Sequence, residues 1–360
     1  MSWLLAFVGF ALLIILHEAG HFAAAKAVGM RVERFSLFFG RPLVSFRRGE
    51  TEYGIGPIPL GGYVRITGMN PREEFSDDVA VRAYYRQPVW KRVVVIAAGP
   101  AVNLVIAFLI LWALFLANGT YVGTHTVSSH DLRQPATRYL QPGDRIVSVD
   151  GVSGDLATIA AQVRRHTCAG GRPTAGCVAT TPAHVVVVRD GRRLAFDIRP
   201  RYDDSTGIHF MRLGFTYGER HETYGPAAAA GQSVSGMWDV TKKTLSVFVH
   251  IFEPSERKQV GSVVGAYHVT QQSFSSDVTT ALGILALISL SLAVVNLFPF
   301  LPLDGGHIFW ALAEKVRGRA IPFAIMERAS VIGFALMLML FVIGFTNDLE
   351  RFHNGGFNLR

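Results

Sequence analysis

The segment His17-Glu18-Ala19-Gly20-His21 has the residue types and the spacing of a zinc hydrolase site. On a helix, histidines at positions i and i+4 lie one turn apart on nearly the same face, so both imidazoles can reach one metal ion while Glu18 stands beside it as a general base. The segment continues an apolar run, where a charged group near the centre of a membrane span costs roughly 2.5 kcal/mol or more. The spacing therefore indicates a functional metal centre inside a membrane.

A third ligand must come from a distant part of the chain, because a catalytic zinc ion usually has three protein ligands and one open position. His17 lies ~24 Å along a helix, so its partner needs a similar depth on another span. Asp304, which directly follows the apolar run over 281–303, is the best candidate. His307 is the alternative ligand. The two cysteines cannot form a four-cysteine zinc site.

The composition identifies the surroundings of this site. The 360 residues are 50% hydrophobic and only 17% charged, which excludes a disordered chain. The net charge of +8 would suit either nucleic acid or a membrane. The basic residues gather beside apolar blocks, which favours the bilayer and no nucleic acid.

Four apolar blocks are long enough, or nearly so, to cross ~30 Å of hydrocarbon. They predict a polytopic α-helical membrane protein with four transmembrane helices over 3–27, 93–117, 281–303 and 329–345, the last gaining a turn from about residue 322. Basic residues cluster between the first and second spans and between the third and fourth. Since such loops stay in the cytoplasm, both termini and the stretch from Asn118 to Thr280 are expected outside the cell membrane. The metal centre would then lie within the bilayer toward the cytoplasmic face.

The long outer stretch begins with a predicted β-rich domain. Pro142 to Gly151 reads as a turn, a strand from Arg145 to Val149 and an Asp-Gly turn, and a hairpin follows at 185–198. This pattern resembles a PDZ domain, although the residues before Pro142 depart from the usual motif; an unrelated small β domain is the alternative. Cys168 and Cys177 fall in this stretch, either as a disulfide or as two free thiols.

Apolar residues spaced by three and four from Val234 predict an amphipathic helix after this domain. That helix either lies in the membrane interface or packs against the outer domain. The expected organisation is therefore spans one and two over 1–117, the PDZ-like domain over 118–204, a linker with the amphipathic interfacial helix over 205–278, spans three and four over 279–346, and an extracytoplasmic tail over 347–360.

The chain resembles the site-2 proteases, a family of intramembrane zinc metalloproteases. Three motifs carry the resemblance: HExxH at 17–21, GPxxN at 99–103, and a variant of NxxPxPxLDGG at 296–306 with one extra residue between its prolines. A single PDZ-like domain suggests the bacterial branch that cleaves membrane-anchored anti-sigma factors, and the composition suggests an actinobacterium.

The resemblance implies zinc bound by His17, His21 and Asp304, with Glu18 taking a proton from the attacking water and passing it to the leaving amine. Asn296 would bind the substrate backbone or the developing oxyanion, or else form a bond between helices. Asn103 is expected to be structural, because Pro100 frees backbone groups that need partners in lipid.

The segment 52–67 is apolar and rich in glycine and proline, which suits a membrane-associated β-hairpin. The resemblance implies that it supplies an edge strand to which an unwound substrate adds, with Tyr63 and Val64 as candidate substrate-binding residues. A cytoplasmic loop with incidental β structure is the alternative. The outer domain would either admit only substrates already trimmed outside, or recruit them by their new C-termini.

Two other classes of protein share some of these features. A non-catalytic PDZ-bearing membrane scaffold could use the metal structurally, but a structural zinc site normally has four protein ligands and only three are evident. A transporter is disfavoured because no second broken helix mirrors the first. The best interpretation is a protease of pre-trimmed single-pass membrane proteins.

Overall fold

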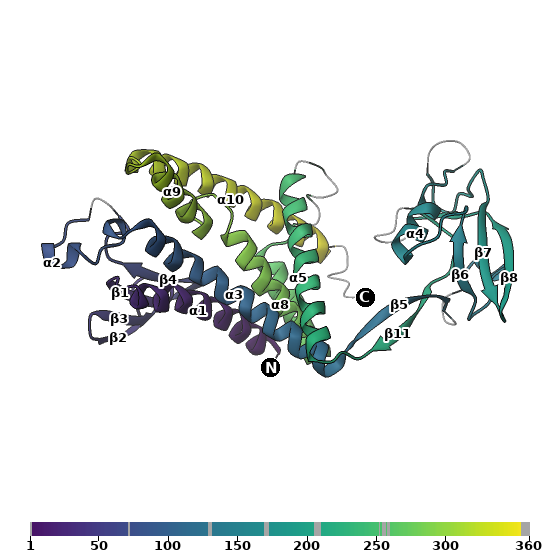
Figure 1. Ribbon diagram of the computed structural model, residues 1–360, viewed down its shortest axis with the longest axis horizontal. Coiled ribbons are helices and arrows are strands. Elements are labelled where there is room, and N and C mark those ends of the chain that lie inside the picture. The colour runs from purple at the N-terminus through teal and green to yellow at the C-terminus, as the bar shows by residue number, and fades with distance from the viewer. Residues whose placement is uncertain are drawn as a thin grey trace. The chain divides into compact units, whose positions relative to one another are not determined.

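The computed structural model describes residues 2–70, 73–128, 132–168, 173–204, 210–251, 253, 257 and 260–353. The chain divides into two compact units, one formed by 1–117 and 225–360 and the other by 118–224. Figure 1 shows the elements of both units. Each unit has its own core.

Among its described residues, the first unit has four helices that are long and apolar enough to cross a membrane, over Ser2–Ala27, Val89–Asn118, Val278–Asn296 and Ala324–Arg351. They correspond to α1 (Ser2–Ala27), α3 (Val89–Asn118), α8 (Val278–Asn296) and most of α10 (Phe323–His353). All four predicted spans are therefore present as helices. The third ends at Asn296, before the two prolines, and the fourth is longer than predicted.

A four-stranded sheet follows α1 directly. Its strands are β1 (Val32–Phe39), β2 (Val44–Arg48), β3 (Thr51–Ile55) and β4 (Ile58–Ile66), in the order β2-β3-β1-β4. β1 pairs in parallel with β3 and antiparallel with β4. The prediction of a hairpin within 52–67 is wrong in its pairing, because β1 lies between β3 and β4. β4 is nevertheless at an edge of the sheet.

Shorter helices connect these elements within the first unit. α2 (Asp77–Ala80) and the 3-10 turn η1 (Tyr84–Arg86) lead into α3, and α5 (Pro226–Val249) and α7 (Val263–Ser276) precede α8. The predicted amphipathic helix is thus present as α5. It packs along α8, where Met237 and Val240 meet Leu290 and Val294, and Phe248 contacts Phe298 with ring centroids 4.4 Å apart.

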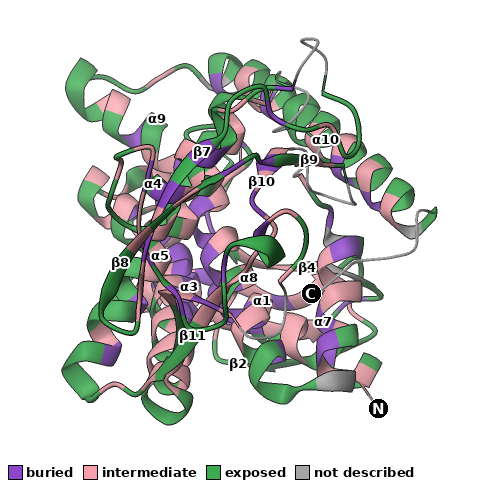
Figure 2. Ribbon diagram, turned by 90° about the vertical axis from the view of Figure 1, so that its right-hand side faces the viewer, coloured by how far each residue is buried: buried purple, intermediate pink, exposed green. Residues whose placement is uncertain are grey.

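α9 (Asp304–Arg317) connects α8 to α10. Helix α10 is exposed over most of its length, as its green colour in Figure 2 shows. Its exposed side chains include Val331, Ile332 and Phe334, which suits a helix whose solvent is lipid. The predicted tail from residue 347 is helical as far as His353, and residues 354–360 lie outside the described part.

The second unit is built on a five-stranded sheet in the order β11-β5-β6-β7-β8, with a separate pair of strands, β9 and β10. Its elements are β5 (Thr120–Val127), the 3-10 turn η2 (Ala136–Arg138), β6 (Arg145–Val149), α4 (Leu156–Arg164), β7 (Ala183–Arg189), β8 (Arg192–Ile198), β9 (Arg201–Asp203), β10 (Phe210–Arg212) and β11 (Tyr217–Glu222). The unit continues beyond residue 204 because β11 returns to pair with β5.

The local turn signals of this unit are confirmed. The predicted strand 145–149 is β6, and β7 and β8 form the predicted hairpin. Asp190 and Gly191, in the hairpin turn, both have positive φ angles, of 49° and 77°. These angles are typical of the tight turn that Asp-Gly favours, because its twist matches that of the two strands.

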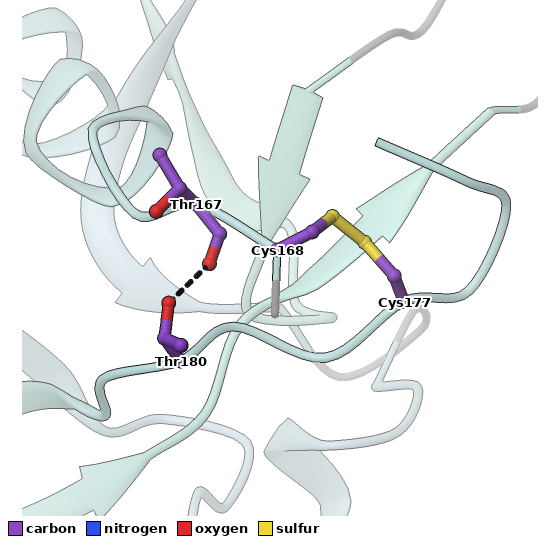
Figure 3. Close-up of a disulfide and its surroundings, with 4 residues drawn as sticks. All are labelled: Thr167, Cys168, Cys177 and Thr180. Atoms are coloured by element: carbon purple, nitrogen blue, oxygen red, sulfur yellow. Dashed lines mark hydrogen bonds between the residues drawn. A yellow bond between two sulfur atoms is a disulfide. The ribbon is translucent and has the colours of Figure 1, made fainter. Parts of the chain in front are cut away.

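Cys168 and Cys177 form a disulfide in the second unit (Figure 3). Thr180 Oγ1 donates a hydrogen bond of 2.8 Å to the carbonyl of Thr167 beside it. Of the two readings that the sequence left open, the structure has the disulfide.

Candidate metal centre

The two histidines of α1 face each other inside the first unit. Their Nε2 atoms are 3.2 Å apart, and the residues are 6% and 7% exposed. The helix places them one turn apart, as the spacing predicts. Buried imidazoles in an otherwise apolar helix need polar partners, which other elements must supply.

Asp304, the first residue of α9, supplies one such partner. Its Oδ2 atom lies 3.3 Å from His17 Nε2 and 3.4 Å from His21 Nε2. Within the described residues, His17, His21 and Asp304 form the one group of three or more His, Cys, Asp or Glu side chains that could hold a metal ion. The sequence placed Asp304 here by matching depths on two spans, and the structure brings the three residues together.

The three facing atoms have the spacing that zinc requires. Ligands 2.0–2.2 Å from a zinc ion at tetrahedral angles are about 3.3 Å from one another, and the observed separations are 3.2, 3.3 and 3.4 Å. Asp304 Oδ2 is buried with no hydrogen-bond partner among the described residues. An acceptor oxygen facing two imidazole nitrogens fits a bound cation, and two nitrogens with one oxygen are a donor set that zinc accepts.

Two glycines bring Asp304 to this position. Helix α8 ends at Asn296, and α9 then begins against the turn that follows α8. A Cβ atom on Gly305 would lie 2.2 Å from the carbonyl oxygen of Leu297, and one on Gly306 would lie 2.5 Å from the backbone nitrogen of Leu301. Larger residues would therefore displace the start of α9, and Asp304 with it, from the turn against which it packs.

Helix α3 supports the histidines from the side away from Asp304. His21 Nδ1 lies 2.9 Å from the carbonyl oxygen of Val95, and His17 Nδ1 lies 3.2 Å from Asn103 Nδ2. Gly99 lies between these two positions, and a Cβ atom on it would be 2.2 Å from His21 Nε2. The glycine of the 99–103 motif is thus explained by the close approach of an imidazole to the backbone of α3.

Glu18 lies beside the cluster and against strand β4. A Cβ atom on Gly62 would be 2.9 Å from Glu18 Cγ, and the backbone N–H of Val64 interacts with the Glu18 carboxylate. The base is therefore adjacent both to the two histidines and to the edge strand of the sheet.

The other predicted site residues lie at different distances from the metal centre. Asn296 Nδ2 is 3.5 Å from His17 Nε2, on the side that faces Asp304. Tyr63 accepts a hydrogen bond from Arg34 through its hydroxyl, and its ring stacks on Phe39. The Tyr63 side chain therefore holds the sheet together, while the backbone of its strand faces the site.

His307 belongs to a neighbouring cavity and not to the three-residue cluster. This cavity has a volume of about 160 Å³, and its lining includes Tyr84, Arg92, His307 and Glu314. Burial raises the pKa of the Tyr84 phenol, so this group stays neutral. Arg92, only 3% exposed, donates two hydrogen bonds of 2.9 and 2.7 Å to Glu314.

Two features of the site are absent from the sequence-based prediction. The Arg92–Glu314 pair joins the start of α3 to α9, the helix that carries Asp304, yet no motif links these residues. The contact of Asn103 with His17 had a signal, since a polar residue within a charge-free span is costly unless it has a partner.

Comparisons with known proteins agree with this chemistry. The model of peptidase family M50 matches residues 5–340, a range that includes His17, Glu18, His21 and Asp304. Zinc metalloprotease Rip1 of Mycobacterium tuberculosis and that of Mycobacterium bovis are each 31% identical to the chain, over 88% of it and 87% of the relative. A Brucella suis protein whose name also describes a zinc metalloprotease is 29% identical over 93% of the chain and 92% of its own length.

Proposed function

This chain belongs to peptidase family M50, and we propose that it hydrolyses peptide bonds within the membrane-spanning segments of other proteins. Family membership makes it a zinc metalloprotease, and its four apolar helices make it a multi-pass membrane protein. The observation that carries the proposal is the convergence of His17, His21 and Asp304, from two different helices, beside Glu18.

We assign His17, His21 and Asp304 as the zinc ligands and Glu18 as the general base. Zinc held there would polarise a peptide carbonyl and lower the pKa of a coordinated water toward ~7. Glu18 accepts one proton from the attacking water and then donates it to the leaving amine, so that one water is consumed for each bond broken. Asn296, whose amide lies on the metal side of His17, is positioned to donate to the developing oxyanion.

The edge strand β4 suits a substrate that has been unwound. A helix hides its backbone groups in internal hydrogen bonds, so a scissile segment must become extended and needs new partners. Since backbone groups alternate along a strand, Gly62 and Val64 direct theirs to the same side. The Val64 N–H interacts with Glu18, so a chain added along this edge would pass beside the base.

The cluster favours catalysis over a structural role. Within the described residues it contains three ligand residues, whereas structural zinc sites are normally closed by four. The proposal is tested with the full chain purified in detergent, a peptide substrate with a membrane-spanning segment, and a chelator. We expect about one zinc per chain and cleavage that stops on chelation and returns with zinc. Cleavage that survives complete removal of zinc would contradict the proposal.

The second unit is proposed to be an extracytoplasmic PDZ-like domain that admits only pre-trimmed substrates, such as anti-sigma factors cut first by another protease. Four spans would leave both chain termini on the same side, and the basic loops between the first and second spans and between the third and fourth would make that side the outer one, with the metal centre nearer the cytoplasm. Trp112 near the end of α3 donates a hydrogen bond to the Pro226 carbonyl at the start of α5. The unit is thus inserted between two helix ends that lie close together.

This closeness makes a deletion practical. Replacing residues 119–224 with a short Gly/Ser linker keeps all four spans and the metal centre. If the unit excludes large substrates, the deletion variant will cleave an untrimmed substrate that the full protein leaves intact. If it recruits substrates, the variant will instead cleave the trimmed form more slowly and gain nothing on the untrimmed one.

A further inference from the structure

Asn103 lies in the middle of α3 and is completely buried. Its side chain contacts the metal centre through His17. Asn103 Nδ2 lies 3.2 Å from His17 Nδ1, which is the ring nitrogen turned away from Asp304. Its Oδ1 atom has no hydrogen-bond partner within the described residues. A buried amide oxygen without a partner is costly, so this arrangement needs an explanation.

The neighbouring histidine shows what a ligand of this site requires. His21 Nδ1 lies 2.9 Å from the Val95 carbonyl, which can only accept, so Nδ1 carries the proton. The neutral ring then has its lone pair on Nε2, the atom that faces Asp304. Metal-binding histidines typically hold their second nitrogen in this way.

For His17, whether the Nε2 atom also carries a lone pair toward Asp304 depends on the orientation of the Asn103 amide. With Nδ2 toward the ring, His17 Nδ1 would have to accept, and the proton would lie on Nε2, between the ring and Asp304. Turning the amide by 180° places Oδ1 against Nδ1 and costs little, because the two ends of an amide have nearly the same shape. The turned amide exchanges its two ends, so Oδ1 gains the Nδ1 proton of His17 as its partner and the Nδ2 group takes the position that Oδ1 held.

We propose that Asn103 is a positioning residue: its side-chain carbonyl accepts the Nδ1 proton of His17 and so keeps the His17 Nε2 lone pair available to the metal. This inference rests on the proposed role of His17 as a ligand.

The geometry of α3 explains how one helix serves both rings. Val95 and Asn103 are eight residues, about 12 Å, apart, whereas His17 and His21 are only about 6 Å apart along α1. Backbone carbonyls point toward the C-terminal end of a helix, and side chains lean toward its N-terminal end. The Val95 carbonyl and the Asn103 side chain therefore converge.

A purely structural role for Asn103 can be separated from this one. The hydrogen bond between α8 and α3 runs from Ser289 Oγ to the backbone carbonyl of Asn103, at 2.9 Å, and does not involve the side chain. Ser289→Ala therefore removes this hydrogen bond and leaves the amide in place, while Asn103→Leu removes the amide and leaves the hydrogen bond in place. The two variants are a matched pair.

The experiment measures zinc affinity of the full chain in detergent by competition with a chromophoric chelator, together with the absorption spectrum of the cobalt form. We expect Asn103→Leu to weaken zinc binding about 10-fold to 100-fold and to alter the cobalt spectrum. Asn103→Asp, whose carboxylate also accepts from Nδ1, should stay within about threefold of the wild type, as should Ser289→Ala. Asn103→Ala, with less bulk, replaces the leucine variant if that protein does not fold.

Wild-type affinity in Asn103→Leu, or an equal loss in Asn103→Asp and Asn103→Leu, would overturn the proposal. His17→Ala distinguishes this failure from failure of the ligand assignment. If His17→Ala binds zinc as tightly as the wild type, then His17 is not a ligand and the proposed site itself is wrong. If it loses zinc while Asn103→Leu does not, only the role of Asn103 is wrong.

Discussion

Asp144 in the second unit and Asp304 in the first are both shielded carboxylates, but their surroundings differ. Asp144 is 1% exposed and receives hydrogen bonds from Arg189, at 2.7 Å to each of its oxygens, and from the backbone N–H of Gln141. Asp304 Oδ2 faces two imidazoles and has no hydrogen-bond partner in the described part of the chain. One carboxylate is satisfied within the fold, while the other needs a group from outside it.

The units that contain these residues also differ in what they bury. The second unit has an apolar core that includes Val149, Ile159, Val185 and Ile198. The first exposes many apolar side chains on α1 and α10 and buries polar ones, including His17, His21, Arg92, Asn103 and Ser289. Water around the second unit explains its apolar core, and lipid around the first unit explains its exposed apolar side chains. In the first unit, buried polar groups therefore mark function more than stability.

The largest effect is expected from Glu18→Gln, which keeps the size of the side chain and removes the base. Cleavage should fall by about 10²-fold to 10⁴-fold, because proton transfer is lost, while zinc content stays at the wild-type level. Cleavage assays and metal analysis on one preparation measure both quantities. Glu50→Gln, a carboxyl-to-amide change in the same unit but outside the cluster, is the control. A variant that turns over at the wild-type rate would mean that another group is the base.

Asp304→Ala should lower zinc affinity by more than about 100-fold, beyond the loss expected from removing a merely supporting contact. Asp348→Asn provides the matched control. Asp348 is 1% exposed in the same unit, but its carboxylate is satisfied by Ser262, Gly265 and Arg351. This control should keep its zinc even if it is less stable. Full zinc content in Asp304→Ala would remove the distinction between Asp304 and Asp144.

The sequence predicted the contacts that follow from residue spacing and from depth along a span. It missed the contacts that depend on how a helix is rotated about its own axis. The i, i+4 spacing predicted the facing histidines, and depth along two spans predicted Asp304. The Arg92–Glu314 pair and the contact of Asn103 with His17 require the rotation of α3 about its axis. A helix that is apolar on every side does not encode that rotation in its hydrophobic pattern.

The same limit appears in the β structure. Asp-Gly turns predicted the β7–β8 hairpin, because such a turn fixes the pairing of its two neighbours. Gly56 and Pro57 separate β3 from β4 in the same way, but β1 lies between these strands. A parallel pairing such as β1 with β3 joins distant segments, and no local turn signals it.

Removing the disulfide should weaken the second unit and leave the metal centre intact. Cys168 and Cys177 are nine residues apart, and a closed loop of this size contributes about 3 kcal/mol by restricting the unfolded chain. In the double Cys→Ser variant, amide hydrogen exchange in β7 and β8 should become up to about 100-fold faster, with unchanged exchange in α1 and α3 and unchanged zinc affinity. Loss of zinc would show that the stability of the second unit affects the metal centre, so that the two units are coupled energetically.

The smallest effect is expected at Glu50, a solvent-accessible carboxylate of the first unit. Like Asp144, it accepts hydrogen bonds from basic side chains. Hydrogen bonds from Arg82 oppose partial burial and, with Lys26, lower the pKa of Glu50 to about 2. A lowered pKa adds stability that is complete above the unfolded value near 4.5 and is lost as the pH falls toward 2. Glu50→Gln should therefore be less stable than the wild type at pH 7, by about 1 kcal/mol or less because water screens the pair. Thermal unfolding of both proteins should show this difference shrinking between pH 4.5 and pH 2, with zinc affinity at pH 7 unchanged. An equal difference at pH 7 and at pH 2 would show that Glu50 acts through packing and not through its charge.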